Sequence, residues 1–171
     1  MRKILETITL VCLGYMSVVT AYVLYGPDPP PDRIPIHFDM AGHPDGWGPT
    51  SGLAVLPFAA FVLYMLITML AHYSTLAHYP DHATPAGRRR LELLSVGMIA
   101  WIKAEMVGIF VCIETTSIQA ARHWDQAMSL VGVWILLGAV FVTIIGHFAA
   151  MVWALHSNQK PAGSEEILSE L

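Results

Sequence analysis

The stretch LELLSVGMIAWIKAEMVGIFVCIETTSI, residues 91–118, is an apolar run long enough to cross a lipid bilayer as a helix. About 20 helical residues cover the ~30 Å of hydrocarbon in a membrane. The run carries two charged side chains in its middle, Lys103 and Glu105. An ionised side chain at the centre of a bilayer helix costs roughly 2.5–3.5 kcal/mol. We therefore expect a partner helix, a water-filled cavity, a ligand or another subunit to offset this cost.

Three further apolar runs have a similar length. Only 13% of the 171 residues are charged, where a soluble domain carries about 25%. The sequence predicts an all-α integral membrane protein with four transmembrane helices, in a single membrane domain over residues 1–171. The predicted spans are Thr7–Tyr25, Leu53–Tyr73, Leu91–Ile118 and Leu130–Leu155.

Basic residues are concentrated on one side of these spans. They lie at the N-terminus, in the second connection and in the tail, at Arg2, Lys3, Arg88, Arg89, Arg90 and Lys160. The opposite connections carry only Arg33 and Arg122. The positive-inside rule then predicts cytoplasmic N- and C-termini, an outer loop over residues 26–52 and a cytoplasmic tail over 156–171. No basic patch is broad enough to indicate a nucleic-acid partner.

The charges of the third span point in different directions. Lys103 and Glu105 are two positions apart, so they project about 200° from each other and cannot pair across a regular helix. Glu114, eleven positions after Lys103, returns almost to the same face. One interpretation is a polar path for protons or cations through Glu105 and Glu114, with Lys103 as a fixed charge. The other is that neighbouring helices satisfy these groups and that they fix the packing.

Histidines offer two further, weaker candidate sites. His72 and His147 fall near the same ends of the second and fourth spans, where two imidazoles could ligate a haem or a pigment. His37, Asp39 and His43 in the outer loop have side chains that suit zinc or another divalent ion. The simpler interpretation is hydrogen-bonded histidines in both places. We therefore expect no metal and no cofactor.

The outer loop has the pattern of an ordered segment. Ile34, Ile36, Phe38 and Met40 alternate with other residues, which predicts a short extended stretch. Gly42 and the pair Asp45-Gly46 are turn signals. We expect a turn at Asp45-Gly46, a His37 buried beneath the loop and Trp47 at the level of the membrane interface.

The same loop carries a motif. It reads Pro31-Asp32-Arg33-Ile34-Pro35-Ile36-His37-Phe38, then Gly42-x-Pro44-Asp45-x-Trp47-Gly48, with Pro57 early in the next helix. It resembles a bacterial membrane family, the domain of unknown function 1648, which is related to the SdpI-type immunity proteins. Members usually have a Lys after the last Gly, where this chain has Pro49-Thr50. The motif residues are Pro35, His37, Gly42, Asp45 and Trp47.

The resemblance implies a protein of the bacterial cytoplasmic membrane. It also implies a non-enzymatic role by interaction, of the binding, immunity or signalling type, with a peptide, lipid or partner protein. No catalytic motif is found in the sequence. The alternatives are an accessory subunit of a larger membrane complex and a small transporter or proton-conducting element. The expected partners are membrane lipids and either other membrane subunits or a second copy in a homodimer.

Overall fold

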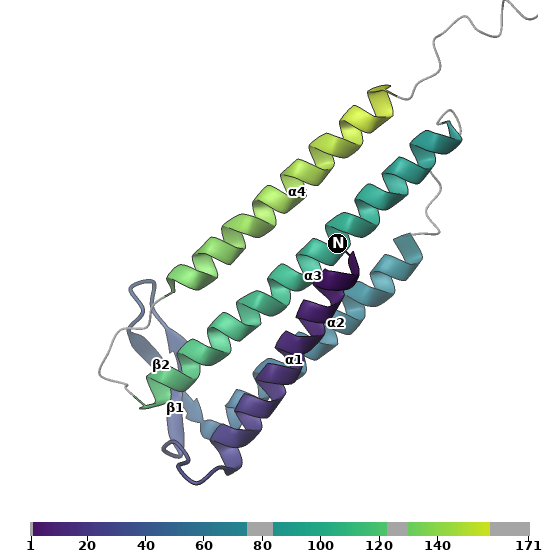
Figure 1. The fold of residues 1–171 in the computed structure, drawn as a ribbon. Coiled ribbons are helices and arrows are strands. Elements are labelled where there is room, and N and C mark those ends of the chain that lie inside the picture. Colours follow the sequence, from purple (N-terminus) through teal and green to yellow (C-terminus); the bar gives the residue numbers. More distant parts are fainter. Residues whose placement is uncertain (1, 75–83, 123–129, 158–171) are drawn as a thin grey trace, which may run out of the picture.

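The computed structural model describes residues 2–74, 84–122 and 130–157. Four long helices cross the molecule roughly side by side (Figure 1). All four are long and apolar enough to span a membrane, which confirms the predicted fold class and makes this a multi-pass membrane protein. The helices are α1 (Arg2–Tyr25), α2 (Val55–Ser74), α3 (Pro85–Arg122) and α4 (Val131–Ser157).

Helix α3 is the centre of the fold. Helices α1 and α2 pack on one side of it, and α4 packs on another side with at most marginal contact to α1 and α2. Figure 1 shows α4 running alongside α3, apart from the other two helices. The described helices thus form a group of three, with α4 as an outlying helix that packs almost entirely on α3. None of the most apolar window of α4 is buried inside the protein, which suits a helix that faces lipid on most sides.

A short hairpin closes the end of the molecule between α1 and α2. Strand β1 (Arg33–Phe38) pairs antiparallel with β2 (Pro44–Pro49), and a 3-10 turn, η1 (Thr50–Ala54), leads into α2. Ile34 is almost fully buried and packs with Val23, Leu53 and Ala121, so the hairpin is anchored on α1 and α3. The ordered loop expected from the sequence is therefore present. It is a two-stranded sheet, where the sequence had indicated one extended stretch.

The hairpin turn lies earlier than predicted. The Asp39 carboxylate accepts hydrogen bonds from the backbone amides of Ala41 and His43, at 2.9 and 2.8 Å. Gly42 has a φ of 87°, a conformation that residues with a Cβ rarely adopt. The pair Asp45-Gly46 belongs instead to strand β2. It was read as a turn because glycine and aspartate are depleted in strands.

Helix α3 extends beyond its predicted span at both ends. Its 38 residues make it about 57 Å long, nearly twice the ~30 Å of a hydrocarbon core. Thr84 caps its first turn, with its hydroxyl oxygen 3.1 Å from the Gly87 amide, and Pro85 follows at the first helical position, where the missing amide costs least. The Arg88–Arg90 cluster therefore lies within the helix. Arg90 stacks on the ring of Trp153 in α4, 4.4 Å from its centroid.

Candidate functional site

Three charged residues in the apolar part of α3, Lys103, Glu105 and Glu114, are all buried, and each contacts a polar side chain of another helix. Lys103 is directed toward α1 and α2, Glu105 toward α4, and Glu114 toward α1. Two residues of separation turn a helix by about 200°, which is why Lys103 and Glu105 lie on opposite faces.

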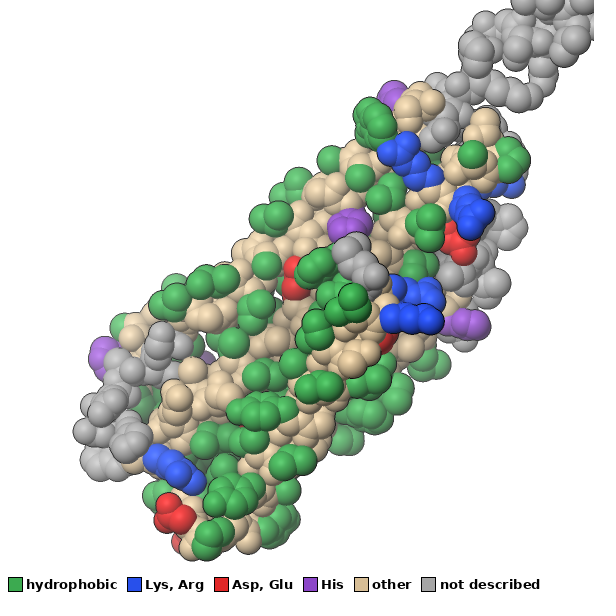
Figure 2. Space-filling view, in the orientation of Figure 1, with side chains coloured by type: hydrophobic (Ala, Val, Ile, Leu, Met, Phe, Trp, Pro, Cys, Tyr) green, Lys and Arg blue, Asp and Glu red, His purple; other side chains and the backbone are tan. Residues whose placement is uncertain are grey.

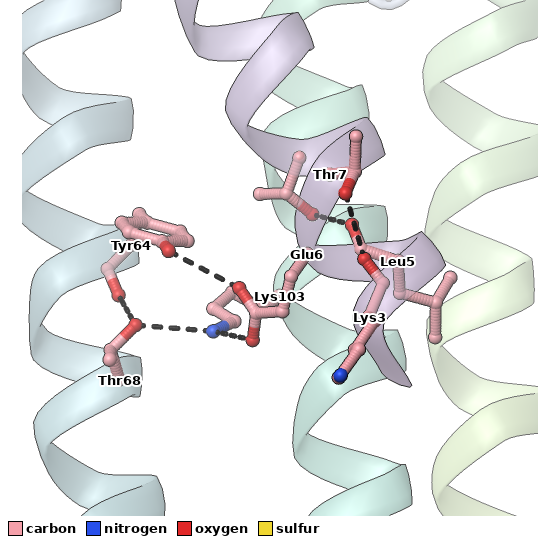
Figure 3. Close-up of polar contacts among 8 residues, drawn as sticks. Lys3, Leu5, Glu6, Thr7, Tyr64, Thr68 and Lys103 are labelled. Carbon is pink, nitrogen blue, oxygen red and sulfur yellow. Dashed lines mark hydrogen bonds and ion pairs between the residues drawn. The ribbon is translucent and has the colours of Figure 1, made fainter. Parts of the chain in front are cut away.

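Lys103 is held in a closed polar network between three helices (Figure 3). Its Nζ lies 2.5 Å from Oε1 of Glu6 in α1 and 3.2 Å from the hydroxyl oxygen of Thr68 in α2. The same Nζ lies 4.6 Å from the centroid of the Tyr64 ring. The Tyr64 hydroxyl donates to the other Glu6 oxygen at 3.2 Å. The lysine charge thus has a carboxylate partner, and its donors are directed at groups of the protein itself.

Sequence reasoning missed Glu6. The predicted first span began at Thr7, so Glu6 lay just outside it and was not considered as a partner for a buried charge. Its position also changes the expected depth of Lys103. Glu6 lies in the second turn of α1, so Lys103 is level with the beginning of that helix, as Figure 1 shows for the N-terminus beside the middle of α3. Lys103 is central in α3 because α3 is long, and it is not central relative to α1.

Glu114 is fully buried and is the least accessible of the three. One of its oxygens accepts a hydrogen bond from the Thr20 hydroxyl of α1, and within the part of the chain that the structure describes the other has no hydrogen-bond partner.

Glu105 borders a groove between α3 and α4. The Thr143 hydroxyl of α4 donates to Oε1 of Glu105 at 2.6 Å, while the buried Oε2 has no hydrogen-bond partner among the described residues. The groove has a volume of about 680 Å³, and its lining is apolar apart from three side chains, those of Glu105, Thr143 and His147. In Figure 2 an acidic and a histidine side chain are visible in the hollow between these two helices.

His147 is linked to the same group. Its Nδ1 lies 2.9 Å from the carbonyl oxygen of Thr143, one turn earlier in α4. A carbonyl can only accept, so Nδ1 carries the hydrogen and Nε2 is the acceptor of the neutral ring. The ring lies against Gly97 of α3, where a Cβ would be in ordinary van der Waals contact with Nε2, at 3.8 Å.

A second cavity of about 370 Å³ lies on the other side of α3, between α1, α2 and α3. Lys103, Glu6 and His72 line it. The two histidines proposed as haem or pigment ligands, His72 and His147, therefore line different cavities on opposite faces of α3 and do not converge on one site. Neither of these cavities joins Lys103 to Glu105.

The hairpin histidines pair with separate carboxylates. Nδ1 of His37 lies 2.5 Å from Asp45 across the strands, and Nδ1 of His43 lies 3.5 Å from Asp39. The hydrogen bond from the His43 amide lowers the pKa of Asp39, and the amide of Ala41 adds to this effect. Within the described residues, no three histidine, cysteine or acidic side chains gather closely enough to hold a metal ion.

One more expectation for the hairpin was wrong. The His37 side chain is 73% exposed, so it is not buried beneath the loop. Gly46 faces the base of His37, where a Cβ would approach the His37 Cβ to 2.9 Å, and the ring is directed to Asp45.

The remaining motif residues support the hairpin. Pro35 is fully buried. The Arg33 guanidinium lies 3.4 Å from the Trp47 carbonyl oxygen. At the departure from the motif, Pro49 ends β2 and the Thr50 amide donates to the Asp32 carbonyl at 3.0 Å.

Comparison with known proteins gives one match. Neither a curated protein nor a solved structure matches the chain. A family model described as a domain of unknown function (DUF1648) matches residues 13–61, which cover most of α1, the hairpin and the beginning of α2. This confirms the resemblance inferred from the hairpin motif: residues 13–61 are similar to the DUF1648 family.

Proposed function

We propose that this membrane protein acts as a binding protein, without catalysing a reaction, and that its binding site is the groove between α3 and α4. The observation that carries the proposal is the free oxygen of Glu105. Leaving a buried polar group without a partner costs about 1–3 kcal/mol, and more for a charged one. A ligand that donates a hydrogen bond to Oε2 removes that cost.

The other two acidic or basic positions fit a structural role better. Lys103 is satisfied within the protein by Glu6, Thr68 and Tyr64. Glu114 is fully buried and accepts a hydrogen bond from Thr20 of α1. A transporter or proton-conducting element would use these residues with Glu105 along one path, but Lys103 and Glu114 are directed toward α1, whereas Glu105 is directed toward α4. The geometry therefore favours binding over conduction.

An accessory-subunit role remains the second candidate, and the outlying position of α4 favours it. The apolar faces of α4 that do not touch α3 are exposed, and another membrane chain or a second copy could pack there. In that case a donor from the other chain would occupy the groove and bond to Glu105.

We place the protein in a bacterial cytoplasmic membrane with the hairpin outside. Arg2 and Lys3 lie at the start of α1 and Arg88–Arg90 near the start of α3, whereas the hairpin packs on the other ends of these two helices. Positive residues favour the cytoplasmic side. The immunity role suggested by the SdpI resemblance is one form of the proposed binding, with a secreted peptide as the ligand and the hairpin as its outer contact.

The test is to fill the groove. We would purify the protein from its native membrane as wild type, as Ala139→Trp, and as Ala149→Trp. Ala139 lines the groove, whereas Ala149 is an exposed position of the same helix outside it. Mass spectrometry of the extracted small molecules and peptides should find a species bound to the wild type and to Ala149→Trp but lost from Ala139→Trp. Equal retention by both tryptophan variants, or no bound species at all, would count against the proposal.

A further inference from the structure

We infer that the natural ligand of the α3–α4 groove is a single-chain amphiphile with a primary ammonium head, an inference that rests on the proposed function. Three properties of the groove restrict the kind of ligand that it can bind: its polar atoms, the charge of its lining and its size.

The polar atoms of the groove select a hydrogen-bond donor. Oε2 of Glu105 is a free acceptor, because the Thr143 hydroxyl is already directed at Oε1. Nε2 of His147 is an acceptor, because Nδ1 uses its hydrogen on the Thr143 carbonyl. A ligand head that only accepts hydrogen bonds would find no donor among these atoms. A head with several N–H or O–H groups can satisfy both.

The charge of the lining selects a cation among the donors. Glu105 is an acidic residue of the groove, and no lysine or arginine is found among the described residues that line it. Lys103, which could have neutralised Glu105 from the same helix, is directed to the opposite face and paired with Glu6. A carboxylate bonded to a cation forms charge-assisted hydrogen bonds, about twice as strong as neutral ones. A primary ammonium supplies both the charge and three donors.

The size of the groove suits a small amphiphile. Its volume of about 680 Å³ lies within the range of about 300–1,000 Å³ typical of small-molecule sites. The apolar lining, with Leu94, Trp101, Ile135 and Val142, suits an alkyl tail.

Trp101 provides the readout for a test. The purified full chain would be placed in nanodiscs of zwitterionic lipid and titrated with dodecylamine brominated on its chain, which quenches nearby tryptophan. The difference in quenching between the wild type and Trp101→Phe isolates the groove from the other tryptophans. The same titration with brominated dodecanol, dodecanoic acid and dodecyltrimethylammonium separates the hydrogen-bond donor from the charge.

We expect the amine to quench the Trp101 component in a saturable way. The concentration for half-saturation should be at least about tenfold higher with the trimethylammonium and with the alcohol, and the acid should give no saturable quenching. Glu105→Gln should weaken the binding of the amine by a similar factor and leave the binding of the alcohol unchanged. Glu114→Gln is the matched control, a buried glutamate of the same helix outside the groove, and should change neither.

The outcomes separate the two claims. Equal binding of alcohol and amine, or an amine affinity that is the same in Glu105→Gln, would overturn the ammonium assignment and leave the groove as a binding site. The head-group series on the wild type gives this answer even if Glu105→Gln does not fold. No saturable quenching of Trp101 by any chain would overturn the proposed function itself.

Discussion

Removing Glu6, the carboxylate partner of Lys103, should destabilise the protein severely. Replacing both Glu6 and Lys103 should not. In Glu6→Gln the lysine charge stays buried, with its side chain 4% exposed, but loses its only carboxylate partner among the described residues. Breaking a buried ion pair from one side costs about 3–5 kcal/mol. The Glu6 side chain is 32% exposed, so water screens part of the effect and we take the lower end, about 3 kcal/mol.

This energy gives a measurable shift in melting temperature. For 150–250 residues, about 1 kcal/mol moves Tm by about 2–4 °C, so Glu6→Gln should melt about 6–12 °C below the wild type. The double variant Glu6→Gln with Lys103→Met removes the stranded charge and should recover most of that loss, because replacing both members of a buried pair is often neutral. Lys3→Met, an exposed charge in the same turn, serves as the control and should melt with the wild type.

The assay is thermal unfolding in one detergent, followed by circular dichroism and by loss of monodisperse protein. A Glu6→Gln variant that melts within about 2 °C of the wild type would refute the reasoning, since it would mean that Lys103 does not depend on Glu6. A double variant as unstable as Glu6→Gln would refute it too, because the loss would then come from packing and not from charge.

Two further predictions concern other contacts. Thr20→Val leaves both oxygens of Glu114 without a donor and should lower stability by about 1–3 kcal/mol, and adding Glu114→Leu should cancel most of that loss in the same melting assay. The pKa of Asp39 is lower in the folded hairpin than in the unfolded chain, where it is about 3.8. Asp39 therefore contributes to folding stability at pH values above this unfolded pKa, and the contribution is lost as the pH falls through the lower folded pKa. Hydrogen exchange of the Ala41 and His43 amides, corrected for intrinsic rates, should therefore accelerate below about pH 4, and Asp39→Asn should remove this pH dependence.

The spans were predictable because hydrocarbon thickness sets a length that is visible in any apolar run. The ends of α3 were not. Arg88–Arg90 were read as the membrane boundary, but a helix can continue into water past its charged residues, with Thr84 and Pro85 forming the actual start. The outlying position of α4 had no signal either, since a helix that is apolar all round suits a lipid face and a buried core equally.

Strand β2 escaped prediction for a different reason. Its sequence, PDGWGP, is rich in residues that are depleted in strands. In the structure those residues allow the pairing. Gly46 and Gly48 face His37 and Ile36 of β1, where a Cβ would come within 2.9 and 2.7 Å of their side chains. The motif was therefore visible in the sequence, but the contact that requires its glycines was not.

For the candidate site, the sequence identified Lys103, Glu105 and Glu114 as groups that need partners. It could not identify the partners, because each belongs to a helix far along the chain: Glu6, Thr143 and Thr20. Hydroxyl residues in apolar helices are common, and nothing in their local sequence indicates which one faces a carboxylate. The groove beside Glu105 also depends on how α4 lies against α3, which only the tertiary structure defines.

The most direct test of the central claim is an experimental structure of the full chain isolated from its native membrane without added ligand. The account predicts an elongated density in the α3–α4 groove, with its polar end within hydrogen-bond distance of Oε2 of Glu105. A groove closed by α4 against α3, with Oε2 bonded to another group of the protein, would contradict it.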